Sequence, residues 1–200
     1  MEADITVVVI LERVCVNIIS SLYQYLPISI IMAALFMVAY KEISTKGIKR
    51  VIHEWISAFR ESADLLKLFM LSVYTCLILF RTVFCRQIWG NPIGDILGNW
   101  SFHFSDGSLS TELIENILLF IPFSFFAVWT FQDKILHGQL AFRNICWRTT
   151  KISFVFSICI EICQIVFRVG TFQISDLVMN TFGGVLGGVC YWIFYKVKRK

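Results

Sequence analysis

The feature that most constrains this 200-residue sequence is a series of continuous apolar blocks separated by short polar segments. A helix needs about 20 apolar residues to cross a bilayer, and the blocks have about that length. They are continuous rather than alternating, so barrel strands, the other structure that lipid tolerates, are disfavoured. At 57% hydrophobic and 16% charged, the chain also has too much apolar surface for one soluble core. The sequence therefore predicts an all-α, polytopic membrane helical bundle.

Five blocks are long enough to cross the membrane as helices. The predicted spans are approximately Leu22 to Tyr40, Leu65 to Phe84, Leu113 to Phe131, Ile152 to Val169 and Leu177 to Tyr195. Residues 5–20 carry Glu12 and Arg13 in their middle, so we interpret them as an interfacial or packed amphipathic helix rather than a sixth span. The expected organisation is therefore residues 1–64, with the amphipathic segment, the first span and a basic loop, followed by a four-helix membrane domain, residues 65–200.

Basic residues are concentrated in alternate connectors, and this distribution predicts the orientation. They precede the second span, separate the third span from the fourth, and form the C-terminal tail: Lys41, Lys46, Lys49, Arg50 and Arg60; Lys134, Arg143, Arg148 and Lys151; and Lys196, Lys198, Arg199 and Lys200. The positive-inside rule places these segments in the cytoplasm and the N-terminus outside, in a multi-pass protein of the cell membrane. The net charge of +4 is then a topology signal, and no nucleic-acid partner is predicted.

The connector between the second and third spans has a different composition. It carries a single basic residue, Arg86, and has Gly, Asn, Pro and Asp at turn positions. We expect it to form a compact loop with short helical pieces. Its last residues, Ser110-Thr111-Glu112, are typical of a helix start.

Polar residues inside the predicted spans are the main functional signal, because an ionisable group near the bilayer centre costs about 3 kcal/mol. The set comprises Arg81, Glu115, Asn116, Glu161, Gln164, Arg168, Asp176 and Asn180. The topology puts its ionisable members in the predicted outer half of the membrane, except Glu161, which lies deeper. Three members of the set, on the fourth span, are spaced i, i+3 and i+7 and share one helix face. The pattern predicts an outward-facing, ligand-binding polar pocket. The alternative is that these groups only pair with one another and hold the bundle together.

Glu161 is the deepest ionisable residue of this set. Arg168 lies two helical turns away, about 10 Å along the axis, which is too far for direct contact. We therefore expect Glu161 to hydrogen-bond Gln164 or a neighbouring span. Arg168 is expected at the outer mouth, paired with Asp176, where its fork of donors suits a phosphate or carboxylate.

The last span contains the segment GGVLGG, in which Gly183 and Gly187, and again Gly184 and Gly188, are four residues apart. Small residues at this spacing let helix backbones approach closely, so we assign these glycines to helix packing rather than to phosphate binding. The stripe formed by Asp176, Asn180 and Gly184 is expected to pack against the fourth span.

Histidines and cysteines show no spacing typical of metal ligands. His53, His103 and His137 lie in separate predicted loops, and the seven cysteines are scattered without a CxxC motif. The sequence predicts no metal site and no cofactor.

Taken together, the polar motifs resemble those of the VanZ-like family. They read Asn116 followed by Pro122-Phe123, then Glu161-x-x-Gln164, Arg168, and Asp176-x-x-x-Asn180-x-x-Gly183, with Ser124 where the family often has Gly. The resemblance covers the chain from about residue 70 onward, so residues 65–200 are expected to form the VanZ-like domain. It implies a role in resistance to teicoplanin-type glycopeptide antibiotics in a Gram-positive-like cell envelope, and a housekeeping role at the membrane is equally compatible with it.

We weigh three functional hypotheses from different classes. The favoured one is a non-enzymatic membrane protein whose pocket engages an anionic envelope lipid or a lipid-linked cell-wall precursor. The alternative is an intramembrane enzyme acting on a lipid head group, with Glu161 as general base, Arg168 or Arg81 as the clamp, and water as the attacking group. The third is a transporter in which Glu161 and Asp176 carry protons, although the usual inverted repeats are absent.

Overall fold

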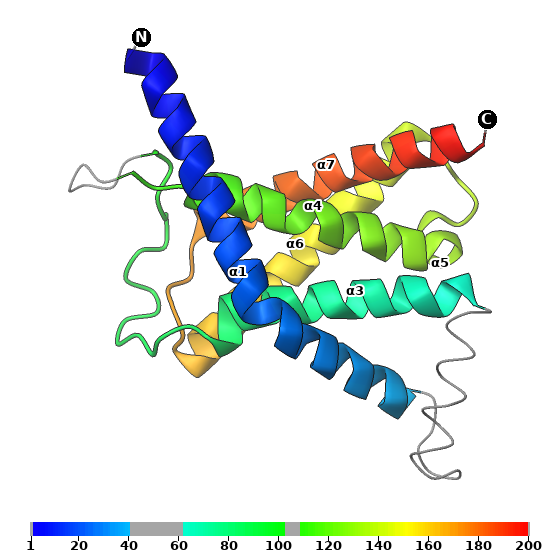
Figure 1. The fold of residues 1–200 in the computed structure, drawn as a ribbon, viewed down its shortest axis with the longest axis horizontal. Coiled ribbons are helices and arrows are strands. Elements are labelled where there is room, and N and C mark those ends of the chain that lie inside the picture. Colours follow the sequence, from blue (N-terminus) through cyan, green and yellow to red (C-terminus); the bar gives the residue numbers. More distant parts are fainter. Residues whose placement is uncertain (1, 41–61, 103–108, 200) are drawn as a thin grey trace.

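The computed structural model describes residues 2–40, 62–102 and 109–199, and the regular elements in these ranges are helical except for one isolated bridge. With the labels of Figure 1, they are α1 (Glu2–Tyr40), α3 (Ala63–Leu79), the π-helical turn η1 (Phe80–Phe84), α4 (Glu112–Thr130), α5 (Gln132–Leu136), α6 (Phe142–Phe167) and α7 (Ile174–Lys198). Five helices, with α3 and η1 counted as one, are long and apolar enough to cross a membrane. The predicted all-α bundle of five spans is confirmed.

The helices form one bundle with two distinct ends (Figure 1). At the end that we call the polar end, η1 and α6 finish while α4 and α7 begin. At the opposite end, the basic end, α3 and α6 begin, α4 and α7 finish, and the short α5 follows α4. Apolar side chains such as Phe120 and Ile160 form a core near the polar end, and Val128, Leu136, Ile145 and Tyr191 form another near the basic end.

The GGVLGG segment of α7 lies buried between α4 and α6. Gly183 and Gly187 lie against backbone carbonyls of α4, while Gly184 and Gly188 lie against Ser and Thr side chains of α6, with no space for a Cβ atom at any of the four. Because the α7 backbone comes this close to both neighbours at residues 183–188, the turns of α7 that precede this segment also lie between α4 and α6. The expected packing of the polar stripe on α6 therefore holds for Asn180 and Gly184.

Helix α1 differs from its predicted form. The predicted amphipathic segment and the first span are one continuous helix, in which the membrane-spanning part runs from Val7 to Met37. No helix-breaking residue separates the two segments, and Ser21 Oγ donates a 2.8 Å hydrogen bond to the Asn17 carbonyl within the helix. The helix contains Pro27, whose missing N–H weakens the backbone ladder, and α1 bends part-way along its length (Figure 1).

Helix α6 begins well before the predicted start of its span at Ile152. Its first turns carry Arg143, Arg148 and Lys151, which the charge pattern assigned to a loop. Hydropathy marks where a helix enters apolar surroundings, whereas the helical backbone can continue beyond that depth. The predicted basic loop before α3 falls mostly on residues 41–61, outside the described residues.

The connector between η1 and α4 is wrongly predicted to contain short helical pieces, because its described residues, 85–102 and 109–111, form turns and extended segments. Closely spaced Gly and Pro residues interrupt any helix there. Its backbone binds the connector between α6 and α7 instead, through Trp89 N to Arg168 O at 2.7 Å and Phe172 N to Pro92 O at 2.8 Å. Ile174 N to Ile96 O at 2.9 Å and Ser175 N to Leu97 O at 3.3 Å continue this pairing. The start of α4 at Glu112 agrees with the helix-start signal.

The close packing of α7 leads to a prediction about glycine substitution. Gly183→Ala places a Cβ against the Ile117 carbonyl of α4 and is expected to cost about 1–3 kcal/mol of stability, because backbone must move. Gly90→Ala is the matched control, since nothing lies within 4 Å of its added Cβ, and its effect should stay within about 0.5 kcal/mol. Thermal unfolding of the purified protein in detergent measures both. Equal effects of the two substitutions would contradict the close approach of α7 to α4.

Candidate functional site

A polar cavity of about 300 Å³ lies at the polar end, between η1, α4, α6, α7 and the two connectors. It is lined by Arg81, Thr82, Arg86, Glu112, Glu115, Asn116, Ile160, Glu161, Gln164, Thr171, Gln173, Asp176 and Asn180. The structure thus brings all the predicted ligand-binding residues together except Arg168. We call this space the polar cavity.

Arg81 lies on η1 and forms an ion pair with Glu115 in the first turn of α4. Glu115 is buried, and its other oxygen accepts hydrogen bonds from Thr111 Oγ1 and, at 2.7 Å, from Asn17 Nδ2 of α1. Arg81 Nη1 also donates to Ser21 Oγ of α1 at 3.1 Å. The pair is therefore largely satisfied within the protein, and it ties α1, η1 and α4 together. A π-helical turn is a frequent feature of functional sites, and here it carries Arg81.

The start of α7 contributes two polar residues to the cavity. Asp176 Oδ1 accepts a 2.7 Å hydrogen bond from Asn116 Nδ2 of α4, so this member of the polar stripe faces α4 and not α6 as expected. Asn180 Nδ2 donates to Ser157 Oγ of α6 at 2.9 Å. The two bonds sit on either side of α7 because α4 and α6 flank it closely.

Two buried amide groups of the cavity have a free acceptor. Gln164 Nε2 donates to the Thr82 carbonyl at 2.9 Å, and Asn180 Nδ2 bonds Ser157, but Gln164 Oε1 and Asn180 Oδ1 have no hydrogen-bond partner among the described residues. Both side chains are at least nine-tenths buried. An unsatisfied buried acceptor is costly, so these oxygens suit N–H or O–H donors of a bound group.

Glu161, in the next-to-last turn of α6, is almost completely buried and faces the cavity rather than lipid. Its Oε2 accepts a 3.0 Å hydrogen bond from the backbone N–H of Gln173, the residue that precedes α7. The bond goes to this connector and not to Gln164, which reaches across to Thr82 instead. The carboxylate is thereby held at a defined position between α6 and the start of α7.

Arg168 is the predicted site residue that the structure places elsewhere. Helix α6 ends at Phe167, and Arg168 adopts a left-handed conformation with φ 54°, which turns the chain away from the helix face. Because the helix ends one residue before Arg168, this residue does not share the helix face of Glu161 and Gln164. Its side chain is exposed, and it forms no ion pair with Asp176 or with any other residue in the described ranges. The predicted Arg168–Asp176 pair is wrong.

Arg86, rather than Arg168, is the second arginine of the polar cavity. It comes from the connector after η1, lines the polar cavity, and lies within electrostatic range of Glu112, Glu161 and Asp176. A Cβ at Gly170, where φ is +92°, would overlap the Arg86 guanidinium, so this glycine gives the arginine its space. The available signal was that Arg86 is the single basic residue of an otherwise uncharged or acidic connector.

The charges of the polar cavity are unequal. Four carboxylate side chains, Glu112, Glu115, Glu161 and Asp176, face two guanidinium groups, and one of these, Arg81, is already paired. Arg86 forms no ion pair shorter than 4 Å with the described residues. No cluster of His, Cys, Asp or Glu suited to a metal ion is found within the described ranges. The cavity therefore offers one unpaired cation, several carboxylates and two free amide oxygens.

The fold and this cavity define a class: a polytopic α-helical membrane protein with a polar site enclosed between the ends of its spans. The chain belongs to the VanZ/LLP1 family, whose model matches residues 32–195. It is also similar to Protein VanZ of Enterococcus faecium, with 32% identity over 85 residues, or 42% of this chain and 47% of that protein. The match thus covers less than half of that relative's length. No solved structure matches the chain.

The family match extends the recognised region beyond the sequence expectation. It begins at residue 32, inside α1, rather than near residue 70. Asn17 and Ser21, which bond Glu115 and Arg81, lie before it. These two contacts therefore come from a part of the chain that the family motifs did not indicate.

The Arg81–Glu115 pair leads to a double-substitution prediction. Removing one partner leaves the other charge unpaired between helices, so Arg81→Met alone is expected to cost about 3 kcal/mol of stability. Replacing both residues, with Arg81→Met and Glu115→Leu, should cost clearly less than the sum of the single changes. Thermal unfolding in detergent gives the coupling, and strict additivity would show that the pair contributes nothing.

Proposed function

We propose that this protein acts in resistance to glycopeptide antibiotics of the teicoplanin type by engaging the head group of an envelope lipid or lipid-linked cell-wall precursor in the polar cavity. The observation that carries the proposal is the convergence of polar groups from η1, α4, α6, α7 and both connectors on one cavity. Polar groups placed between membrane spans are costly unless they serve a site or a pairing network. Here the network leaves Arg86 and two amide oxygens unpaired among the described residues.

The charges of the cavity indicate which head group fits. The Arg86 guanidinium offers a fork of donors suited to a phosphate oxygen pair. A simple anion, however, would meet the surplus of carboxylates from Glu112, Glu161 and Asp176. A head group that carries both a phosphate and an amino group satisfies both, because its ammonium also donates to Gln164 Oε1 and Asn180 Oδ1. Among anionic lipids and precursors, we therefore favour a head group that carries both a phosphate and an amino group.

An intramembrane enzyme that acts on a lipid head group is the second candidate. The fixed position of the Glu161 carboxylate, in one cavity with Arg86, is the observation that favours it. Glu161 would act as general base and Arg86, in place of Arg168, as the clamp. No Ser-His or Cys-His pair lines the cavity among the described residues, so water would be the attacking group. The non-enzymatic function requires fewer components and is the one we favour.

We also propose the orientation that the charge distribution supports, with the N-terminus and the polar end outside and the C-terminus in the cytoplasm. Cys85, exposed in the first connector, should then react with a membrane-impermeant maleimide in intact cells. A cysteine introduced by Lys198→Cys should react only after permeabilisation. Each protein carries a single cysteine: the first keeps only Cys85, and the second carries only the cysteine introduced at position 198, with the other native cysteines replaced by Ala. The reverse pattern of labelling would invert the orientation and place the polar cavity in the cytoplasm.

The function is tested with two matched arginine substitutions. Arg86→Gln removes the unpaired cation of the polar cavity, whereas Arg168→Gln removes an exposed arginine of the next connector that does not line it. In a susceptible Gram-positive host, we expect Arg86→Gln to abolish the increase in teicoplanin minimal inhibitory concentration, and Arg168→Gln to retain it. Loss of a charge-assisted contact of about 2 kcal/mol would weaken ligand binding roughly 30-fold.

The controls make this comparison decisive. A C-terminal fluorescent fusion reports the amount and the insertion of each variant, so that loss of protein is separated from loss of function. Equal resistance in the two variants would remove the polar cavity from the function. A lipid species that changes on overexpression, and no longer changes with Glu161→Gln, would favour the enzyme over the binding protein.

A further inference from the structure

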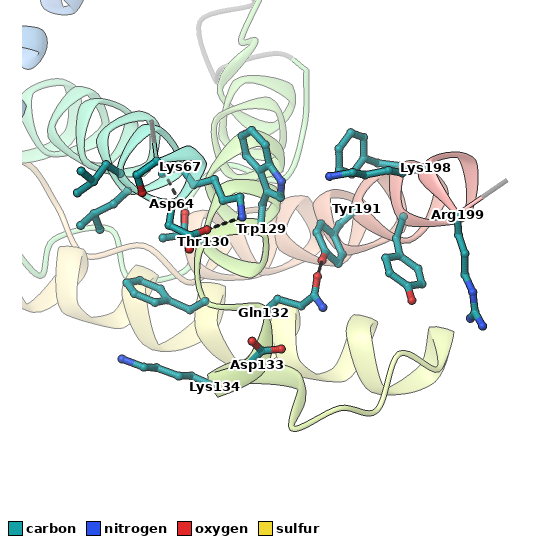
Figure 2. A pocket seen from close by; sticks show the side chains of 16 residues that line it. Asp64, Lys67, Trp129, Thr130, Gln132, Asp133, Lys134, Tyr191, Lys198 and Arg199 are labelled. Atoms are coloured by element: carbon teal, nitrogen blue, oxygen red, sulfur yellow. Dashed lines mark hydrogen bonds and ion pairs between the residues drawn. The ribbon is translucent and has the colours of Figure 1, made fainter. Parts of the chain in front are cut away.

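A second and larger cavity, of about 800 Å³, lies at the basic end of the bundle. It is formed by the start of α3, the end of α4, α5 and the end of α7 (Figure 2). Its wall includes Lys67, Trp129, Lys134, Tyr191, Lys198 and Arg199. We call it the basic cavity; it shares no lining residue with the polar cavity.

The charge of the basic cavity is the opposite of that of the polar cavity. Four cationic side chains line it, against the two carboxylates Asp64 and Asp133. Asp64 is already paired with Lys67, at 2.7 Å. Lys134, Lys198 and Arg199 form no ion pair with the described residues, so three cations remain available to a ligand.

The inner wall of the basic cavity is aromatic and held in place by hydrogen bonds. Tyr191 is almost fully buried, and its hydroxyl donates to Gln132 Oε1 at 2.6 Å (Figure 2). Thr130 Oγ1 donates to the Lys67 carbonyl at 3.1 Å, which ties the end of α4 to the start of α3. The Trp129 ring stacks edge-on against Phe194 at 6.1 Å between centroids. Lys134, Lys198 and Arg199 therefore lie around a fixed aromatic floor and point in different directions (Figure 2).

We propose that the basic cavity binds a phosphate ester. The unpaired cations around the cavity give it a net positive charge that attracts a phosphate group, and the aromatic floor accommodates the apolar part to which that group is attached. An anionic phospholipid head group and a soluble phosphate ester both carry this chemistry. The proposal does not depend on the ligand of the polar cavity, because the two cavities lie at opposite ends of the bundle and have opposite charge.

The test compares two triple variants of the full-length protein, purified in detergent, by native mass spectrometry. The first, Lys134→Ala with Lys198→Ala and Arg199→Ala, removes the unpaired cations of the basic cavity. The second, Arg143→Ala with Lys151→Ala and Lys196→Ala, removes the same charge from α6 and α7 without touching that cavity. Each protein is titrated with phosphatidylglycerol, phosphatidylcholine and glycerol 3-phosphate.

We expect the first triple variant to lose about 100-fold in affinity for phosphatidylglycerol, or roughly fivefold for each cation, and the second to lose less than about threefold. Equal losses in the two variants would overturn the proposal, since the basic residues would then act only as a general charge belt. Equal binding of phosphatidylcholine and phosphatidylglycerol by the native protein would overturn it as well.

Competition by glycerol 3-phosphate distinguishes the two sources of the phosphate ester. Competition at a concentration similar to that of the lipid identifies a soluble ligand, and failure to compete identifies the lipid. All six substituted residues are exposed, so an unchanged thermal transition is the expected sign of correct folding.

Discussion

The close approach of α7 to α4 and α6 is the interaction on which the polar cavity depends. Where no Cβ fits at Gly183 or Gly184, two backbones come near enough for short polar side chains to meet across them. One turn earlier on α7, Asn180 reaches Ser157, and two turns earlier Asp176 reaches Asn116. In a bilayer no water replaces such partners, so the packing of the glycines and the satisfaction of the polar groups support each other.

Helix α1 has a different relation to the site. Between residues 7 and 20 it exposes most of its apolar side chains, yet Asn17 and Ser21 turn toward the bundle and bind the Arg81–Glu115 pair. These contacts satisfy both oxygens of Glu115 and part of the donor capacity of Arg81. As a result, Arg86 and the carboxylates nearer to α6 and α7 are left as the part of the cavity that is free to bind something else.

The sequence was informative wherever a property depends on the local composition of a helix. Hydropathy located the five spans, and helical spacing put Glu161 and Gln164 on one face. It was uninformative where a tertiary contact decides the outcome. The end of α6 at a left-handed Arg168 is a backbone event that no periodicity records, and it removed that arginine from the site. Arg86 reaches the cavity because two connectors pair with each other, and nothing in their composition specifies this pairing. The continuity of α1 was missed because charge at Glu12 and Arg13 suggested a boundary where the backbone has none.

The pairing of these two connectors also limits how often the wall of the polar cavity opens. Both contribute walls to the polar cavity, and four backbone hydrogen bonds join residues 89–97 of the first connector to residues 168–175, which comprise the second connector and the first two residues of α7. Separating the connectors would break all four at about 1 kcal/mol each, so the opened form should be populated at roughly one part in a thousand. Because these bonds involve only backbone atoms, the pairing should be insensitive to most side-chain substitutions in the connectors. The walls of the polar cavity are therefore fixed by the chain fold, while its charge is fixed by its side chains.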